Sequence, residues 1–257
     1  MMTYSMLGKN GRLGNQMFQY AALMGTSFIR GRKFMIPQEG HDLHNVFELG
    51  SQEDFDPNYT AEFVYQEPSF LYDKNVNILP DKTELRGYFQ SPYYFLHCED
   101  RIREEFKFKK EIEDEANACI EYFRQKDNPL CSLHFRRTDY LEKSDYHHVQ
   151  DVNYYNKCLQ IVQGNIPNPR FICFSDDIDW CKNSLGNSLE YVHNSPAVDL
   201  AIMSKCDVHI IANSSFSWWG AWLSKSAGVL APAKWFGPSG PSDWRSIYYP
   251  SWHQIGG

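Results

Sequence analysis

The sequence lacks long apolar runs and has few positive charges. No apolar stretch is long enough to span a bilayer, and we find no signal peptide. The 257 residues carry 25 lysines and arginines against 32 aspartates and glutamates, so the formal net charge is −7. The basic residues form no stripe, which argues against nucleic acid as a partner. The acidic balance also argues against a strongly anionic acceptor.

Paired cysteines and cofactor motifs are also missing. The seven cysteines are odd in number and show no Cys-x-x-Cys spacing, so most of them suit a core in a reducing cytosol. No G-x-G-x-x-G loop is present, which argues against a nicotinamide or flavin. The only adjacent carboxylates at a strand end, Asp176 and Asp177, are contiguous, and their side chains should diverge in an extended segment. We therefore expect a cytoplasmic protein that needs no metal and no cofactor.

Four aromatic residues gather near the carboxyl terminus: Trp244, Tyr248, Tyr249 and Trp252. If exposed, they permit peripheral contact with a membrane by a protein that has no transmembrane segment. The alternative is that the tail packs back across the first domain.

Strand and helix signals alternate through the second half of the chain. Short apolar runs predict strands at residues 130–135, 170–174, 190–192, 208–212 and 228–231. Helical patterns between them cover 178–185, 197–205 and 216–224. This alternation predicts βαβ units on a parallel sheet, within an α/β protein. The turn-rich segment 126–129 follows two charged helical patterns, so we predict two domains, 1–126 and 127–257.

Polar side chains follow three of the predicted strands. The strand at 130–135 contains His134 and leads into Arg136, Arg137 and Asp139. Two guanidiniums at the carboxyl end of a parallel strand suit a diphosphate, and the carboxylate can hold one of them in place. An ordinary surface ion pair is the alternative.

The other two strands end in short polar turns. Ser175, Asp176 and Asp177 follow the strand at 170–174, where one aspartate caps the next helix and the other can bind a base or ribose. The strand at 208–212 leads into a turn just before an aromatic-rich helix, where free N–H groups favour phosphate. Capping of the helix is the alternative for any one serine. The turn consists of Asn213, Ser214, Ser215, Phe216 and Ser217.

The amino-terminal loop contains Gly14, Asn15 and Gln16, after a weak strand at residues 3–7 and at the start of a helix that extends to Ile29. The two amides offer neutral donors and acceptors, as a sugar-binding loop would. Helix-entry hydrogen bonding is the alternative. The aromatic cluster at 88–95 suits the apolar side of a galactose ring, although core packing explains it equally well.

Four motifs together resemble the bacterial α-1,2-fucosyltransferases: GRLGNQMFQYA, HFRRTDY, FSDD and NSSFSWWGAWL, in this order along nearly the whole chain. The resemblance implies an inverting enzyme of the GT-B type, with two Rossmann-like domains facing across a cleft. It also implies that residues 1–126 form the acceptor side and 127–257 the GDP-fucose-binding domain with a tail. The donor would be GDP-β-L-fucose, and the acceptor the 2-hydroxyl of a terminal β-galactoside in an oligosaccharide or lipid-linked glycan, as in surface glycan or O-antigen synthesis.

The same resemblance gives the motif residues their roles. Arg136 and Arg137 match the arginines that hold the diphosphate, and Asp139 matches a carboxylate of the same motif. The remaining donor-binding residues are His134, the 175–177 cluster and the 213–217 turn. Thr138 replaces a usual glycine and resembles the α-1,6-fucosyltransferases, which leaves open the hydroxyl that is fucosylated.

The base that takes the acceptor's proton stays open among six residues: Asp139, Glu142, Asp145, Glu39, Asp42 and His44. A fucosyltransferase of other regiochemistry, an enzyme for another nucleotide sugar, and a nucleotide- or sugar-binding module without turnover are the rival functions.

Overall fold

The chain divides into two compact α/β units in a computed structural model that describes residues 1–124, 128–186, 189–226 and 228–256. Unit 1 comprises Met1–Lys109 and Asp243–Tyr249, and unit 2 comprises Lys110–Ser242 and Pro250–Gly257. The predicted boundary at 126/127 lies outside the described residues. The observed division falls earlier because helix α4 (Lys110–Phe123) packs on helix α8 (Pro196–Met203) of unit 2.

Unit 1 contains a four-stranded parallel sheet in the order β2-β1-β4-β3. The long helix α1 follows β1 and is buried on nearly all sides, as its run of small and aromatic residues requires. The elements of unit 1 are β1 (Met2–Thr3), α1 (Leu13–Ile29), β2 (Phe34–Met35), α2 (Leu43–Val46), β3 (Phe63–Gln66), η1 (Lys74–Ile78), β4 (Thr83–Arg86), η2 (Pro92–Tyr94), η3 (Leu96–Cys98), α3 (Glu99–Glu105) and η4 (Arg245–Ile247).

Unit 2 contains a six-stranded parallel sheet in the order β10-β9-β8-β5-β6-β7. Helices connect most of its strands, as the alternating pattern predicts. Besides α4 and α8, its elements are β5 (Leu130–Phe135), α5 (Thr138–Glu142), α6 (Val152–Asn165), β6 (Arg170–Ser175), α7 (Ile178–Leu185), β7 (Glu190–Val192), β8 (Val208–Ile210), α9 (Ser215–Leu223), β9 (Val229–Pro232) and β10 (His253–Ile255).

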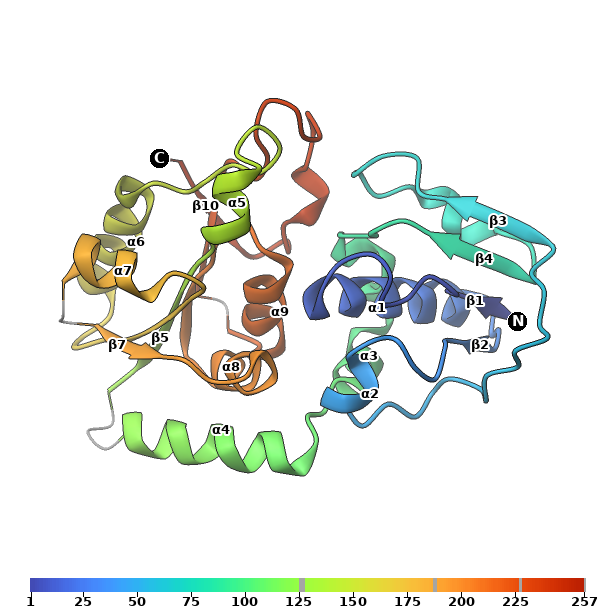
Figure 1. Cartoon of the computed structure of the whole chain (residues 1–257), viewed down its shortest axis with the longest axis horizontal. Helices are drawn as coiled ribbons and strands as arrows, with labels where there is room; N and C mark the ends of the chain where they lie inside the picture. The colour runs from blue at the N-terminus through green and yellow to red at the C-terminus, as the bar shows by residue number, and fades with distance from the viewer. Residues whose placement is uncertain (125–127, 187–188, 227, 257) are drawn as a thin grey trace. The chain divides into compact units, whose positions relative to one another are not determined.

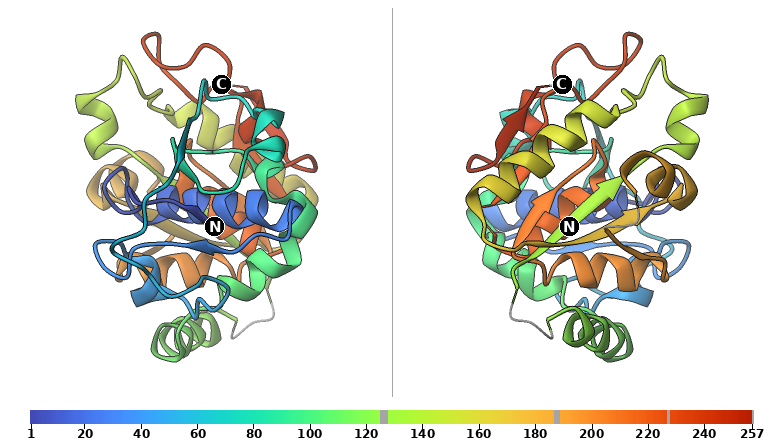
Figure 2. Two further views of the ribbon diagram at one scale, coloured as in Figure 1. Left: turned by 90° about the vertical axis from the view of Figure 1, so that its right-hand side faces the viewer. Right: turned by 90° about the vertical axis from the view of Figure 1, so that its left-hand side faces the viewer.

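Helices cover both faces of this sheet. Figures 1 and 2 show α6 and α7 over one face and α8 and α9 over the other. Alternate residues of the strands face α6 and α7, and Leu133 and Phe135 of β5 pack there with Tyr155 and Cys158 of α6. Figure 2 shows the strands running side by side, so their carboxyl ends lie along one edge. The polar turns that follow β5, β6 and β8 therefore share that edge.

The carboxyl-terminal segment differs from expectation. Residues 243–249 pack within unit 1, while β10 extends the sheet of unit 2 beside β9. Tyr248 and Trp252 are only 6% and 7% exposed, and Trp252 lies against Trp218 with ring centroids 5.0 Å apart. These two side chains are core residues, and the packing of residues 243–249 within unit 1 agrees with the alternative that the tail packs back across the first domain. Of the described helices, none is both long and apolar enough to cross a membrane.

Two glycines of unit 2 allow a matched test of this packing. A Cβ added at Gly220 in α9 would lie 2.7 Å from the Cβ of Met203 in α8, whereas a Cβ at Gly164 in α6 would meet no atom within 4 Å. We expect Gly220→Ala to lower the free energy of unfolding by about 1–3 kcal/mol, because the two helices must separate.

Gly164→Ala is the control, and we expect it to raise the free energy of unfolding by roughly 0.5 kcal/mol, since alanine favours a helix. Urea titrations of both variants measure the difference. The same sign of change in both would contradict the close α8–α9 contact.

Candidate functional site at the edge of the unit 2 sheet

The strand order of unit 2 reverses between β5 and β8. From β5 the chain steps outward to β6 and β7, and then returns to place β8, β9 and β10 on the other side. The place where the strand order reverses is called the switch point of the sheet. In open α/β sheets, ligands bind there, at the carboxyl ends of the strands. Arg136 and Arg137 follow β5, and Asn213 to Ser215 follow β8. The two sequence motifs therefore lie at the position where a ligand is expected.

Arg136 is held by two carboxylates. Its Nη2 lies 2.7 Å from Oδ2 of Asp139, and its Nη1 lies 3.1 Å from Oδ2 of Asp176. Its guanidinium carbon also lies 5.6 Å from the centre of the Tyr140 ring. Because the Arg136 side chain is only 17% exposed, these contacts fix its orientation more firmly than a surface ion pair would.

Arg137 is fixed in a different way. Its backbone N–H donates to Oδ1 of Asp176 at 2.9 Å, and its Nε lies 3.4 Å from Oδ2 of Asp177. The guanidinium lies over the Trp180 ring, 3.6 Å from the ring centre. A planar cation stacked on indole is a favourable geometry for arginine. The remaining guanidinium edges can donate to an anion without a change of rotamer.

Asp176 and Asp177 both point toward the arginines, so the expectation that their side chains diverge is wrong. The backbone leaves the extended conformation at Asp177, which caps helix α7 by accepting from the N–H of Trp180 at 3.2 Å. That turn brings both carboxylates to one side. Capping was the predicted role for one of them, and Asp177 carries it out in addition to contacting Arg137.

Thr138, the residue that departs from the fucosyltransferase motif, has a local role. Its hydroxyl donates to Oδ2 of Asp176 at 2.7 Å. A glycine here would lack that hydrogen bond. The threonine therefore helps to position the carboxylate that contacts both arginines.

The turn after β8 has three structural members, Asn213, Ser214 and Ser217, and a more accessible pair. Asn213 is buried and its amide donates to the carbonyls of His148 and Trp235. Ser214 caps α9 by accepting from the N–H of Phe216. The next two residues, Ser215 and Phe216, are partly exposed at the first turn of the helix. Of the predicted phosphate-binding turn, these two are the ones best placed to meet a ligand.

Ser217 is buried, and its hydroxyl donates back to the carbonyl of Ser214 at 3.4 Å. Its side chain therefore serves the helix. Ser175, at the end of β6, accepts from the N–H of Asp177 at 2.9 Å and shapes the aspartate turn.

His134 lies beneath this site as a neutral, buried imidazole. It is 6% exposed, and its ring centre lies 5.7 Å from that of Phe216. Burial lowers its pKa from 6.5 to about 3, and the charge of Arg136 acts in the same direction. Among the described residues no group bonds its Nδ1. A histidine of this kind supports the wall of the site and does not supply charge.

The predicted amide loop belongs to unit 1. Gly14 is buried in α1, and Gln16 exchanges two hydrogen bonds with Asp42, from Nε2 to Oδ2 at 3.0 Å and from the Asp42 N–H to Oε1 at 2.8 Å. Asn15 is partly exposed and accepts from Nε2 of Gln90 at 2.6 Å. Gln16 thus braces the loop, and Asn15 is the more accessible of the two amides.

Asp139, Asp176 and Asp177 are paired with the two arginines, which bears on their use as metal ligands or as a base. Among the described residues, no group of three or more histidine, cysteine or acidic side chains is arranged to hold a metal ion. Of the six candidate bases, Asp139 pairs with Arg136 and Asp42 with Gln16, while Glu39, Glu142 and Asp145 are exposed. His44 contacts the carbonyl of Gln38 at 3.0 Å. No geometric feature selects one of them as the base.

Two aromatic residues of the site were missed from the sequence, Tyr140 and Trp180. Each lies three residues beyond a polar site residue, namely Arg137 and Asp177. Aromatic residues at helical spacing from an arginine or from its carboxylate are the signal that would have identified them.

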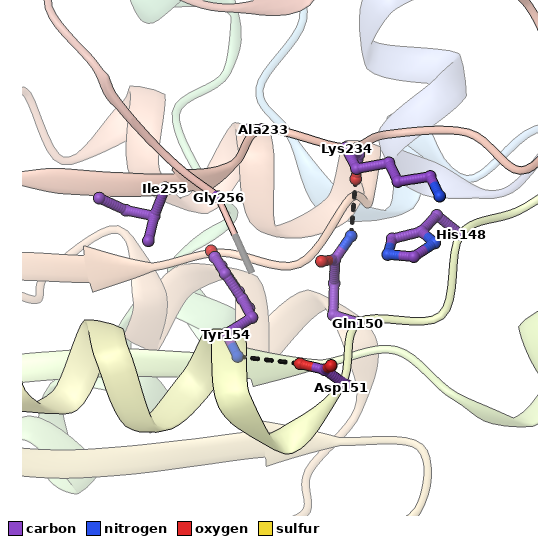
Figure 3. A pocket seen from close by; sticks show the side chains of 8 residues that line it. All are labelled: His148, Gln150, Asp151, Tyr154, Ala233, Lys234, Ile255 and Gly256. Atoms are coloured by element: carbon purple, nitrogen blue, oxygen red, sulfur yellow. Dashed lines mark hydrogen bonds between the residues drawn. The ribbon is translucent and has the colours of Figure 1, made fainter.

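A separate hollow of about 280 Å³ lies elsewhere in unit 2 (Figure 3). His148, Asp151, Lys234 and Ile255 are among its lining residues, and the amide of Gln150 donates to the carbonyl of Lys234 across it. None of the predicted site residues within the described chain lines it. Asn213 links the hollow to the site, because its amide donates to the carbonyl of His148, which lines the hollow.

The buried His134 predicts a pH-dependent stability. Because its folded pKa lies below its unfolded value of 6.5, the unfolded chain binds one more proton between pH 6.5 and about 3. The free energy of unfolding should therefore fall by about 1.4 kcal/mol per pH unit from this residue alone as the pH is lowered below 6.5. We expect His134→Asn to make that slope shallower by this amount in urea titrations.

The exposed His253 is the control, and we expect His253→Asn to leave the slope unchanged. If the slope of His134→Asn matched that of the unmodified chain, the imidazole would already be charged in the folded protein.

Sequence comparisons agree with the motifs. The family model for glycosyl transferase family 11 matches residues 3–256. An alpha-1,2-colitosyltransferase of Escherichia coli is 31% identical, over 88% of this chain and 90% of its own length. The O-antigen biosynthesis glycosyltransferase WbnK of the same species is 30% identical, over 88% and 93%. Human galactoside alpha-(1,2)-fucosyltransferase 1 is 25% identical, over 84% and 64%.

Solved structures share the fold. The fucosyltransferase NodZ from Bradyrhizobium superimposes with a TM-score of 0.58 at 13% identity, over 94% of this chain and 96% of that one. POFUT1 in complex with GDP-fucose gives a TM-score of 0.56 at 13% identity, over 90% and 97%. The expected α/β fold of the GT-B type, with two units that each contain a parallel sheet, is confirmed. With a family match over almost its entire length, the chain belongs to glycosyl transferase family 11.

Proposed function

We propose that the protein transfers L-fucose from GDP-β-L-fucose to the 2-hydroxyl of a terminal β-galactoside, with inversion at the anomeric carbon. The observation that carries the proposal is the pair of guanidiniums at the switch point of the unit 2 sheet, fixed by carboxylates and by Trp180. Of the residues predicted from the sequence, Arg136, Arg137, Ser215 and Phe216 would meet the donor, and Asp139, Asp176 and Asp177 would hold the arginines.

The positions of the two arginines suit the negative charge that develops on the donor during the reaction. As the bond from the anomeric carbon to the phosphate oxygen breaks, negative charge grows on the β-phosphate. Arg136, Arg137 and the Ser215 turn would meet that charge with donors that are already oriented. Loss of one such donor typically costs about 3–4 kcal/mol of transition-state stabilisation. Asp139 and Asp176 would act by holding Arg136 in position.

The relatives support the donor and the linkage. Several are named as galactoside 2-fucosyltransferases, and one is named for O-antigen biosynthesis. The matched NodZ and POFUT1 structures include complexes with GDP-fucose or GDP. The acceptor would be a galactoside of a surface glycan or lipid-linked precursor, bound on unit 1 near Asn15. All seven cysteines are free and six are buried, as suits an enzyme of the cytoplasm.

A colitosyl donor is the second candidate, because the alpha-1,2-colitosyltransferase is among the similar relatives, at 31% identity. The site described above does not distinguish the two sugars, since its contacts concern the diphosphate. The hydrogen bond from Thr138 to Asp176 gives that residue a role in the arginine network, so its presence does not by itself favour a 6-linkage.

A donor screen tests the proposal. GDP-fucose, GDP-colitose and UDP-galactose would be offered with a β-galactoside in the presence of EDTA, with release of the nucleotide as readout and NMR of the product for the linkage. We expect GDP release from GDP-fucose and an α-fucoside on the 2-hydroxyl. Binding of GDP without turnover would indicate a binding module, and a product at another hydroxyl would overturn the regiochemistry. Activity that appears only when a divalent metal replaces EDTA would contradict the arginine-based mechanism.

The arginine pair yields a sharper prediction. We expect Arg137→Ala to abolish transfer and Arg137→Lys to lose most of kcat/KM, because an ammonium group cannot reproduce a planar, two-pronged contact or the stack on Trp180. Initial rates with the fucosyl donor measure the loss, and circular dichroism verifies the fold.

Arg124→Lys is the matched control. Arg124 also pairs with an aspartate, Asp207 at 3.1 Å, but its side chain is 42% exposed and lies away from the switch point. The Arg124→Lys variant should therefore retain full activity. Near-native turnover in Arg137→Lys would refute the diphosphate contact.

A further inference from the structure

Unit 1 has a switch point of its own. In its sheet the strand order reverses between β1 and β4, because β2 lies on one side of β1 and β4 and β3 lie on the other. The loop with Asn15 follows β1, and residues 87–90 follow β4. By the same rule as for unit 2, a ligand of unit 1 is expected at these carboxyl ends.

Glu67 directly follows β3 at this edge and reaches the segment after β4. Its carboxylate accepts from the N–H of Tyr88 at 2.7 Å and from the N–H of Phe89 at 3.0 and 3.1 Å. Gly87 allows this approach, because a Cβ there would lie 2.4 Å from the Cβ of Glu67. The glycine also has a φ of 152°. Glu67 is a partly exposed residue, and the two N–H groups fix its carboxylate at this edge of the sheet.

The carboxylate of Glu67 has no cation partner among the described residues, and only the two N–H groups offset its charge. Burial therefore raises its pKa to about 7, although both hydrogen bonds act in the opposite direction. Glu84 on the neighbouring strand is different, because it pairs with Arg86 at 3.1 Å and accepts from the hydroxyl of Ser5. Glu67 is thus the carboxylate of this edge that changes charge near neutral pH.

The titratable side chains that interact with Glu67 are phenols: Tyr4, Tyr65 and Tyr94. Burial raises the pKa of Tyr4, Tyr65 and Tyr94, and the negative charge of Glu67 adds to each shift. These three hydroxyls stay neutral across the pH range in which Glu67 titrates. Tyr65 also donates to Asp73 at 2.6 Å, so that second carboxylate is engaged away from Glu67.

Hydrogen bonds join Glu67 to the amide loop. The segment that it binds continues to Gln90, which donates to Asn15 at 2.6 Å. The carbonyl of Gly87 accepts from the hydroxyl of Tyr4 and from Nε2 of Gln19 in α1, the latter at 3.3 Å. Tyr88, whose N–H donates to Glu67, is 43% exposed and presents an aromatic side chain on the same segment. A carboxylate, an amide and an aromatic ring together are the groups that recognise a sugar hydroxyl and the apolar face of its ring.

We propose that Glu67 is the general base that takes the proton of the acceptor hydroxyl. This inference rests on the proposed fucosyl transfer. In the step, the acceptor oxygen forms a bond to the anomeric carbon while its proton passes to a carboxylate oxygen of Glu67. The bond from that carbon to the β-phosphate oxygen breaks, and its electron pair leaves with GDP. Glu67 then releases the proton to water.

The pH profile of Glu67→Gln tests this role. In the unmodified enzyme, kcat/KM for the acceptor should rise with pH through about 7, because the base must be ionised. In Glu67→Gln we expect kcat to fall by about 10²–10⁴-fold, KM for the acceptor to change little, and the rise to disappear. The glutamine keeps an oxygen for the two N–H groups and removes a buried charge, so its melting temperature at pH 8 should be unchanged or higher.

Glu84→Gln is the matched control and should retain both the rate and the pH profile. If Glu67→Gln kept the rate and the rise, or lost activity only through a lower melting temperature or weaker acceptor binding, Glu67 would be a structural residue and the inference would be wrong. Those outcomes would not contradict the proposed fucosyl transfer. An unmodified enzyme that transfers no fucose would instead refute the proposed function.

Discussion

The network of arginines and aspartates between the ends of β5 and β6 determines the rest of the site. Two neighbouring guanidiniums repel each other, and each can stay in place only because Asp139, Asp176 and Asp177 offset their charge. The parallel pairing of β5 with β6 brings Asp176 and Asp177 to the arginines, and the first turn of α5 supplies Asp139. Since both arginines are already ordered, a diphosphate need not immobilise them, which saves roughly 0.5–1.5 kcal/mol for each side chain.

The two units have similar sheets but place different polar groups at the switch point. Each has a parallel sheet with one reversal of strand order, and each gathers polar groups at that point. In unit 2 the groups are two arginines held by three aspartates, and the arginines can bind a phosphate ligand. In unit 1 they are amides, phenols and Glu67, whose carboxylate has no cation partner among the described residues. The arginines suit a nucleotide sugar on unit 2, and the amides and Glu67 suit a neutral alcohol on unit 1.

Local patterns predicted the elements well, and long-range contacts explain what they missed. The strand at 130–135 and the helix at 178–185 follow from periodicity and lie where the sequence predicts them. The pairing of β10 with β9 depends on a contact between distant segments that no local pattern encodes. The roles of Asn213 and Gln16 as buried braces were missed for the same reason, because their partners lie 22 to 65 residues away. No sequence pattern identified Glu67 as a site residue, because its environment arises only when β3 and β4 pair.

A crystal structure of the protein with GDP would locate the diphosphate directly. We expect the diphosphate to lie at the ends of β5 and β8, within hydrogen-bond distance of Arg137 and the Ser215 turn, with Arg136 still contacting Asp176. Electron density for the diphosphate in the hollow lined by His148 and Lys234, with both arginines still bound only to their carboxylates, would contradict it.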